Sequence, residues 1–344
     1  MKKLLAWLLL ALLSVGLSAT ALAVVGSETQ KSDASIPATF NFYQSYITSD
    51  NATPNTFPAE TLHFTVVRAA SNPDDTMITI ADQTVDANPD EIVINVPAYT
   101  KVGHYIYTVT ETAGSTQGVA YSAASFDVEV LVDFENQSDD RQTLRRLVVF
   151  KTHKKDASGK KVDTVTNTYD TGSLSVKKTV SGNLASNTQL FDIAVTFTAE
   201  EGRTVKSAIT YTGGSDASTQ GTIGAADWTS GTASRTIRIH DGETVTFSDI
   251  PDGVKYTVIE AEAHKAAAEL NSGDDSKGYT ATGEITTATP IVKGETTGVV
   301  VNNDKGTAVN TGISLDSLPY IIALTVVAVG AVVFLLRRRH RKDD

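Results

Sequence analysis

Hydrophobic and polar residues alternate in short runs through the middle of the chain. These runs are rich in Val, Ile, Thr, Phe and Tyr, and they fall at 61–69, 77–85, 91–99, 104–111, 125–134, 173–180, 190–199, 234–250 and 255–262. A two-residue period with this composition is typical of β-strands that bury one face. Gly, Asn, Asp and Pro separate the runs at short intervals, as turns require. The pattern predicts an all-β protein built from Ig-like, Greek-key β-sandwiches.

Two long apolar stretches at the ends of the chain do not follow this period. Residues 1–23 carry two lysines, an apolar run and a small-residue site at 21–23, which predicts a secretory signal peptide. The alternative is an N-terminal membrane anchor, and the polar, turn-rich residues that follow argue against it. Leu318–Leu336 is a run of 19 residues without a charge, long enough to cross a bilayer as a helix. The basic cluster 337–342 that follows would remain cytoplasmic, so we expect an exported chain with its C-terminus held at the membrane.

The region between these ends repeats itself. A strand "HYIYTVTE" ends at Glu111 and a similar strand "VKYTVIE" ends at Glu260. Each lies some tens of residues before a strand that ends in asparagine, at Asn167 in the first case and at Asn302 or Asn303 in the second. We therefore expect domain 1 at 30–171, domain 2 at 172–305 and a C-terminal sorting region at 306–344.

Charge and composition exclude several functions. Without residues 1–23 and 313–344, the chain has 22 basic and 37 acidic residues, a net charge of −15. This argues against binding to nucleic acid or to anionic membranes. The chain has no cysteine, so disulfides cannot stabilise it. Its six histidines show no ligand spacing, and we expect neither a metal nor a cofactor.

Three polar residues of domain 2 fall on faces that should be buried. Strand alternation places Lys178 with Leu174 and Val176 on an inward face. Glu260 shares a face with Tyr256 and Val258 in the same way. In "VVVNN", Asn303 follows the parity of Val299 and Val301, whereas Asn302 follows that of Val300. Lys178, Glu260 and Asn303 are therefore the candidate site, with Asn302 as the alternative to Asn303.

Such a set can react with itself. A lysine kept neutral in an apolar site is a nucleophile, and a nearby Asn carboxamide offers an acyl carbon. A carboxyl group with a raised pKa can polarise the amide and transfer protons. The product is a Lys–Asn amide that replaces a disulfide and releases ammonia. The alternative is a buried Lys–Glu salt bridge, or a lysine whose amine reaches solvent.

These motifs resemble the streptococcal pilin isopeptide-linkage (T-antigen, FctA-like) domains of Gram-positive pilus shaft proteins. The resemblance rests on the opening strand with Lys178, the "Y-x-V-x-E" strand, and "V-x-V-x-N-D-K" at Val299–Lys305, together with both ends of the chain. It implies an isopeptide bond between Lys178 and Asn303, with Glu260 as the catalytic acid. It also implies a structural subunit, which is a sortase substrate and not an enzyme.

Domain 1 departs from this pattern. Its first strand, "ATFNFYQSYI" at 38–47, has Gln44 where the family has lysine, and no lysine occurs between 32 and 100. Glu111 and Asn167 are present, but a glutamine amide is a poor nucleophile. We therefore expect no bond in domain 1, and instead a buried hydrogen-bonded cluster of Gln44, Glu111 and Asn167.

The sequence "AVNTG" at 308–312 precedes the apolar span and the basic tail, the order of a sortase sorting signal. Related pilins often have Pro where this chain has Asn310. A sortase would cut between Thr311 and Gly312 and pass the Thr311 acyl group to an amine. The resemblance favours Lys160 as the acceptor in the next subunit, then Lys161; the alternative for this cluster is a solvated hairpin loop.

The sequence thus predicts a cell-surface pilin, polymerised and wall-anchored by a class B/C-type sortase, whose partners are neighbouring subunits and possible host surface ligands. The alternative is a wall-anchored adhesin or minor pilin that does not polymerise. An ordinary membrane protein with one span is the alternative to the sorting signal.

Overall fold

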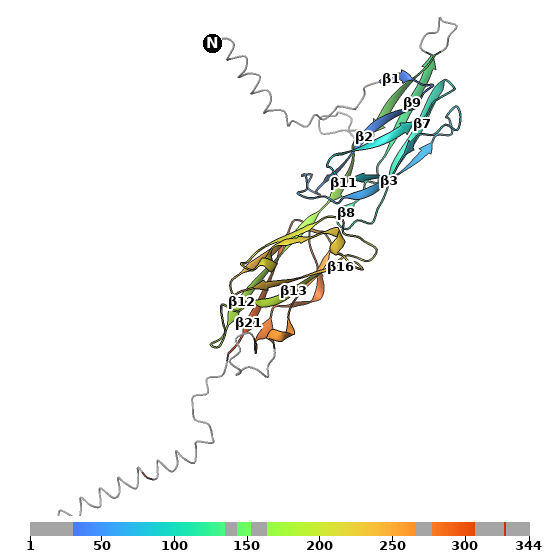
Figure 1. The fold of residues 1–344 in the computed structure, drawn as a ribbon. Helices are drawn as coiled ribbons and strands as arrows, with labels where there is room; N and C mark the ends of the chain where they lie inside the picture. The colour runs from blue at the N-terminus through green and yellow to red at the C-terminus, as the bar shows by residue number, and fades with distance from the viewer. Residues whose placement is uncertain (1–29, 135–142, 153–163, 266–276, 307–326, 328–344) are drawn as a thin grey trace, which may run out of the picture.

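Two β-sandwiches lie end to end in the computed structural model of the chain, which describes residues 30–134, 143–152, 164–265, 277–306 and 327 (Figure 1). Apart from the isolated helical residue Val327, the regular structure of these residues consists of strands and three short 3-10 turns, so the all-β prediction is confirmed. The turns are Ala217–Thr219, Ala225–Asp227 and Glu262–His264. Among the described residues, none forms a helix long and apolar enough to cross a membrane. The predicted signal peptide and nearly all of Leu318–Leu336 lie outside the described residues.

Domain 1 is formed by β1–β11, arranged as two facing sheets. The larger sheet has the order β1 (Gln30–Asp33), β10 (Leu144–Thr152), β9 (Ser125–Phe134), β7 (Gly103–Thr112), β3 (Glu60–Arg68) and β5 (Gln83–Val85). The other sheet has the order β4 (Thr79–Ile80), β6 (Asp90–Val96), β2 (Ala38–Ile47), β11 (Thr164–Tyr169) and β8 (Val119–Ala120).

Domain 2 is formed by β12–β21, also arranged as two facing sheets. One sheet has the order β15 (Gly221–Ile223), β14 (Ile209–Gly213), β17 (Thr244–Pro251), β12 (Thr171–Ser181), β21 (Thr296–Asp304) and β19 (Thr280–Thr282). The other has the order β16 (Thr232–Ile239), β13 (Phe191–Thr198), β18 (Lys255–Glu260) and β20 (Ile285–Pro290).

Alternation along the strands builds both cores. In β13, for example, every second residue from Phe191 to Phe197 is fully buried, and the residues between them are only partly covered. The burial of these side chains drives the two sheets of each domain together. In both domains the inward residues of the first long strand and of the last strand therefore face the same core.

The first long strand and the last strand of each domain are parallel neighbours. In domain 1, β2 pairs with β11, and in domain 2, β12 pairs with β21 over nine residue pairs. Two parallel strands need a long crossover between them, and here the rest of each domain forms that crossover. The arrangement brings residues more than 100 positions apart in sequence to adjacent positions on one face of a sheet.

A hydrogen-bonded joint connects the two domains. The backbone N–H of Gln117, between β7 and β8, donates to the Thr204 carbonyl at 2.8 Å, and the Thr204 N–H donates to the Ser115 carbonyl at 2.9 Å. The Gln117 side chain is only 2% exposed. Its Nε2 donates to the Asp252 carbonyl at 2.7 Å, and its Oε1 accepts from the Glu200 N–H at 3.0 Å. Both ends of this amide therefore bind domain 2.

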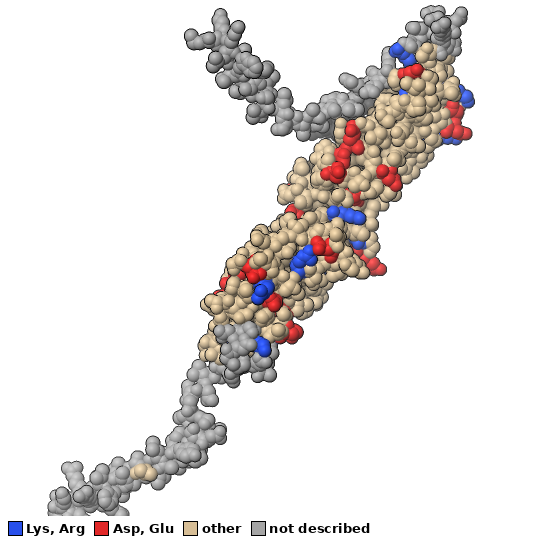
Figure 2. Space-filling model, viewed as in Figure 1, with Lys and Arg blue, Asp and Glu red and all other residues tan. Residues whose placement is uncertain are grey.

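Charged side chains lie singly or in small groups over the face of the two domains shown in Figure 2. Acidic and basic groups are interspersed on this face, and no continuous basic patch is visible there. This distribution agrees with the acidic composition of the chain, and the described residues on this face form no surface suited to a polyanion.

Candidate functional site

The parallel pair β12–β21 places two of the candidate residues on the same inward face. Lys178 lies opposite Val301 in the register, and Asn303 lies opposite Val180, two residues further along. Glu260 ends β18 in the facing sheet, so its side chain meets the other two across the core. Lys178 and Asn303 are both 0% exposed, and Glu260 is 1% exposed. The structure thus brings together all three residues that strand parity selected.

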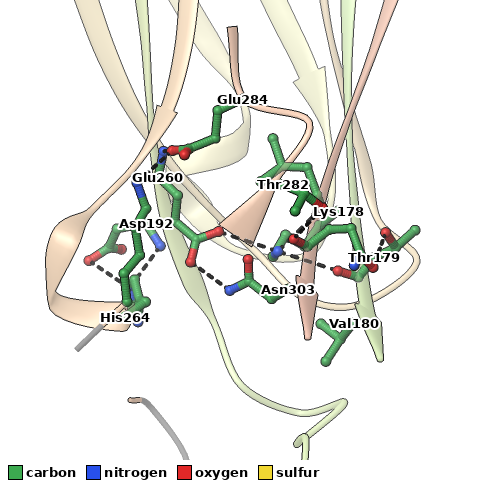
Figure 3. A network of polar contacts seen from close by, with 12 residues as sticks. Lys178, Thr179, Val180, Asp192, Glu260, His264, Thr282, Glu284 and Asn303 are labelled. Carbon is green, nitrogen blue, oxygen red and sulfur yellow. Dashed lines mark hydrogen bonds and ion pairs between the residues drawn. The ribbon is translucent and has the colours of Figure 1, made fainter. Parts of the chain in front are cut away.

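Glu260 contacts both of its partners (Figure 3). Lys178 Nζ lies 3.3 Å from Glu260 Oε2, and Asn303 Nδ2 donates to Glu260 Oε1 at 2.6 Å. Lys178 Nζ also lies 3.3 Å from the carbonyl oxygens of Thr179 and Val301. Asn303 Oδ1 is buried and has no hydrogen-bond partner among the described residues. An amine, a carboxyl group and an amide carbonyl thus meet in a site closed to water.

Burial lowers the pKa of Lys178 to about 8, against the opposing attraction of the Glu260 carboxylate. The Phe191 ring contributes to this enclosure, because Lys178 Nζ lies 4.5 Å from its centroid. A lysine with this pKa has a substantial neutral fraction near neutral pH, and only the neutral amine is a nucleophile. If Lys178 and Glu260 formed only an ion pair, removing their two charges from water would cost free energy.

Asn302 points away from this site. Its side chain is partly exposed, its Oδ1 accepts from Thr179 Oγ1 at 3.0 Å, and its Nδ2 donates to Ser181 Oγ at 3.5 Å. The structure therefore places Asn303, and not the alternative Asn302, beside Lys178 and Glu260.

Domain 1 contains a related arrangement. Gln44 and Asn167 are 0% exposed, and Glu111 is 5% exposed. Asn167 Nδ2 donates to Glu111 Oε1 at 2.7 Å, and Asn167 Oδ1 accepts from the Ser122 N–H at 2.8 Å. Glu111 Oε2 is buried and has no hydrogen-bond partner among the described residues.

The structure differs from the predicted three-residue cluster in one respect. Gln44 Nε2 donates to the carbonyl of its own neighbour, Ser45, at 3.2 Å, and Gln44 Oε1 has no partner in the described part of the chain. Glu111 and Asn167 therefore bond to each other without Gln44. Lys178 Nζ also contacts the carbonyl of its next residue, but it reaches Glu260 as well. The glutamine nitrogen is one atom nearer its backbone than a lysine nitrogen, and it makes no hydrogen bond to Glu111.

Burial raises the pKa of the Glu111 carboxyl to about 7. The hydrogen bond from Asn167 opposes this shift, and the charge of Glu60 adds to it. Glu60 is itself buried, where it accepts hydrogen bonds from Tyr46 and Thr116, each at 2.5 Å. No cation among the described residues lies within ion-pair distance of Glu111, so its ionised form is the costly one.

The candidate site predicted from the sequence did not include Phe191, Ser122 or Glu60. Phe191 could have been found, because it shares the inward parity of Ile193 and Val195. Ser122 acts through its backbone N–H, and no side-chain pattern predicts such a contact. Glu60 lies at the first residue of β3, where alternation was not yet visible.

The remaining candidate residues lie outside the described part of the chain. These are the predicted cut site, Thr311–Gly312, and the two predicted acceptors, Lys160 and Lys161. Among the described residues, no group of His, Cys, Asp and Glu could hold a metal ion.

The chain is similar to pilins of Streptococcus pyogenes in sequence and in fold. A curated protein named pilin from Streptococcus pyogenes serotype M1 is 26% identical over 253 residues, which cover 70% of this chain and 69% of that protein. The major pilin protein T-13 of S. pyogenes superposes with a TM-score of 0.50 at 20% identity, covering 80% of this chain and 99% of that one. The chain has the fold of the streptococcal major pilins. A second such pilin, T3.2, also gives a TM-score of 0.50, at 18% identity and with the same coverage.

The predicted resemblance to streptococcal pilus proteins is confirmed by these pilins. A family model described as a domain of unknown function (DUF7601) also matches residues 172–310, which span domain 2 and the segment just after it. The pilin-like fold therefore extends over both domains, whereas this family model covers only the second.

Proposed function

We propose that the chain is a structural subunit of a cell-surface pilus, with an intramolecular Lys178–Asn303 isopeptide bond in domain 2. The similarity to a streptococcal pilin over 253 residues supports the structural role. The observation that carries the bond is the buried contact of Glu260 with both an amine, at 3.3 Å, and an amide, at 2.6 Å. All three side chains are buried, so water does not compete with Lys178 for the Asn303 amide carbon.

The reaction needs only these three side chains. The reactive state forms when the proton of Lys178 passes to Glu260, which leaves a neutral amine beside a carboxyl group. The amine attacks the Asn303 Cγ, and the Glu260 carboxyl stabilises the carbonyl oxygen when the amide turns that oxygen toward it. Glu260 then moves a proton from the attacking nitrogen to the leaving nitrogen. The Cγ–Nδ2 bond breaks, ammonia leaves, and the new amide joins β12 to β21. Glu260 ends protonated, as it was in the reactive state.

Assembly would use the residues at the C-terminal end. A class B/C-type sortase cuts between Thr311 and Gly312 and transfers the Thr311 acyl group to Lys160, or to Lys161, of a neighbouring subunit. The order of Thr-Gly, apolar span and basic tail supports this step. The subunit is exported, held transiently by Leu318–Leu336, and then fixed to the wall or the pilus.

Two measurements test the proposal. The purified chain should be lighter than its sequence mass by one ammonia, about 17 Da, and Lys178→Ala should restore the full mass. A loss of two ammonias, or of none, contradicts the assignment of a single bond to domain 2. Polymers that resist SDS should form in a host with the sortase, and they should disappear when Lys160 and Lys161 are both replaced by Ala.

A single anchored species at monomer mass would instead favour a non-polymerising adhesin or minor pilin, which uses the same anchor. The sorting signal fits both roles, so the polymer assay decides between them.

A further inference from the structure

A buried carboxyl group lies behind the joint between the two domains. Glu60 begins β3 and is 5% exposed. No Lys, Arg or His among the described residues lies within ion-pair distance of it. Three hydroxyl groups donate to it instead. The Tyr46 hydroxyl donates to Oε1 at 2.5 Å, and Thr116 Oγ1 donates to Oε2 at 2.5 Å. The Tyr121 hydroxyl also donates to Oε2.

Two of these hydroxyl groups lie on either side of a loop that reaches domain 2. Thr116 lies in the loop between β7 and β8, and Tyr121 directly follows β8. The Thr116 N–H also donates to the Tyr121 hydroxyl at 3.3 Å. Hydrogen bonds to a carboxylate are among the strong ones in proteins. Glu60 therefore fastens both sides of this loop to the core of domain 1.

Thr116 is also at the centre of the contact with domain 2. It forms an isolated parallel bridge with Thr204, and its neighbours Ser115 and Gln117 supply the two backbone hydrogen bonds of that bridge. The Thr116 carbonyl accepts from Arg203 Nη1 at 3.4 Å. Thr116 is only 3% exposed. Its side chain thus bonds within domain 1, whereas its backbone bonds to domain 2.

A second route leads from Glu60 to domain 2 through two aromatic rings. The Tyr46 ring packs edge-on against the Tyr169 ring, with centroids 6.5 Å apart and an angle of 76° between the planes. The hydroxyl groups of Tyr169 and of Ser207 in domain 2 are hydrogen-bonded at 2.5 Å. Tyr169 is 0% exposed and Ser207 is 4% exposed. A change at Glu60 can therefore reach the joint through this stack as well as through the loop.

We propose that Glu60 is the positioning residue that sets the angle between the two domains, although its three hydrogen bonds all lie within domain 1. The carboxylate holds residues 115–117 in the conformation that meets Thr204, so the loop docks as a preformed surface. Without this anchor the loop moves with domain 2, and the joint loosens while both cores remain folded. This role does not depend on the isopeptide bond proposed for domain 2.

The first test is hydrogen exchange, in the full chain, of the two amides that cross the joint, those of Gln117 and Thr204. Thr116→Val keeps the shape of the side chain but removes the hydroxyl group that reaches Glu60. Both amides should exchange about tenfold faster in this variant, as expected when one anchoring hydrogen bond is lost. Glu60→Gln should act in the same direction, because an amide offers one acceptor oxygen instead of two. Thr116→Ser keeps the hydroxyl group and should exchange like the parent.

The second test measures the angle itself. The chain has no cysteine, so Thr65→Cys and Thr236→Cys, both at exposed positions, attach one spin label to each domain. Double electron–electron resonance should give a broader distribution of label distances with Thr116→Val than without it. Ile94→Val is the control for general weakening of domain 1, because Ile94 is fully buried and pairs with Phe40 near the start of β2, away from the joint. Its distribution should match that of the parent.

Three results would overturn the proposal. Parental exchange and an unbroadened distribution in Thr116→Val would mean that the joint holds without the carboxylate. Equal loosening in Ile94→Val would mean that any weakening of the domain 1 core suffices. A Thr116→Val chain that fails to fold, while Thr116→Ser folds, would mean that the hydroxyl group serves the core and not the joint.

Discussion

Replacing Glu111 by Gln should change how the stability of domain 1 depends on pH. Burial raises the pKa of the Glu111 carboxyl from 4.5 to about 7 in the folded protein. Below pH 4.5 the group is protonated in both the folded and the unfolded state, so it contributes no difference. Between pH 4.5 and about 7 the unfolded chain has released the proton while the folded chain keeps it, so the free energy of unfolding falls as pH rises.

The size of this effect follows from the two pKa values. At ~1.4 kcal/mol per tenfold change in the ionisation equilibrium, the parent should lose about 3 kcal/mol between the two limits. Glu111→Gln keeps the shape of the side chain but cannot ionise, so it should lose none of this. The variant should therefore gain about 3 kcal/mol on the parent as the pH rises through this range. Any constant cost of repacking cancels when two pH values are compared.

The assay is urea unfolding of parent and variant at several pH values from 4 to 8.5, read by pulsed hydrogen exchange. Peptides from β7 and β11 report on domain 1, and peptides from β18 serve as an internal control in domain 2. Two curves that run parallel across the whole range would refute the argument, because Glu111 would then be ionised or solvated without cost. A gap that opens equally in β18 would show that the effect is not local to domain 1.

The other predictions concern the bond and the joint. Asn303→Ala should abolish the loss of ammonia, whereas Asn302→Ala should retain it; intact mass decides, and the reverse result would move the electrophile. Lys178→Met should lower the free energy of unfolding of domain 2 by up to about 5 kcal/mol, since the bond closes a chain loop of 125 residues; calorimetry showing an unchanged transition would contradict a covalent link. Gln117→Ala removes side-chain hydrogen bonds across the joint, each of which contributes about 1 kcal/mol. The variant should show a broader distribution of interdomain angles by small-angle X-ray scattering. An unaltered scattering curve would mean that the backbone hydrogen bonds alone hold the two domains in place.

Strand parity was enough to select the inward-facing residues of the candidate site. A buried strand fixes which alternate positions face inward. The burial of Lys178 and Asn303, and the outward direction of Asn302, could therefore be predicted without a structure. Parity could not predict which strands are neighbours, because pairing depends on contacts far apart in sequence. The meeting of β18 with the pair β12–β21 was inferred from chemistry and from the family resemblance.

Two predicted strands were wrong in extent, for local reasons. The run 77–85 is two short strands in different sheets, because β4 pairs with β6 whereas β5 pairs with β3. The run 234–250 breaks between β16 and β17, where Gly242 has a φ of +80° that suits a turn. Both breaks leave a mark in the sequence. Ile78 and Ile80 have the opposite parity to Val85, and an Asp-Gly pair, typical of a hairpin turn, separates Ile239 from Val245.

The interdomain joint was not predicted at all. Gln117 lies in a loop, and nothing in its neighbourhood distinguishes it from a solvent-exposed glutamine. Its role follows from the meeting of two loops that lie more than 80 residues apart. Such a contact depends on how the finished domains dock, which single-strand patterns do not encode.

The parallel pairing of β12 with β21 has a consequence for tension along the chain. The chain enters domain 2 at Thr171, the start of β12, and leaves it at Asp304, the end of β21. Because the strands run in the same direction, tension on these two ends pulls them past each other. It loads the proposed Lys178–Asn303 bond or, in its absence, the hydrogen bonds of the pair together, in shear. The strands β13 to β20 lie between β12 and β21 in the sequence but outside this path of force, so they carry little of the load. Domain 2 therefore transmits force through one pair of strands, and the remaining strands support that pair by packing and by placing Glu260 beside it.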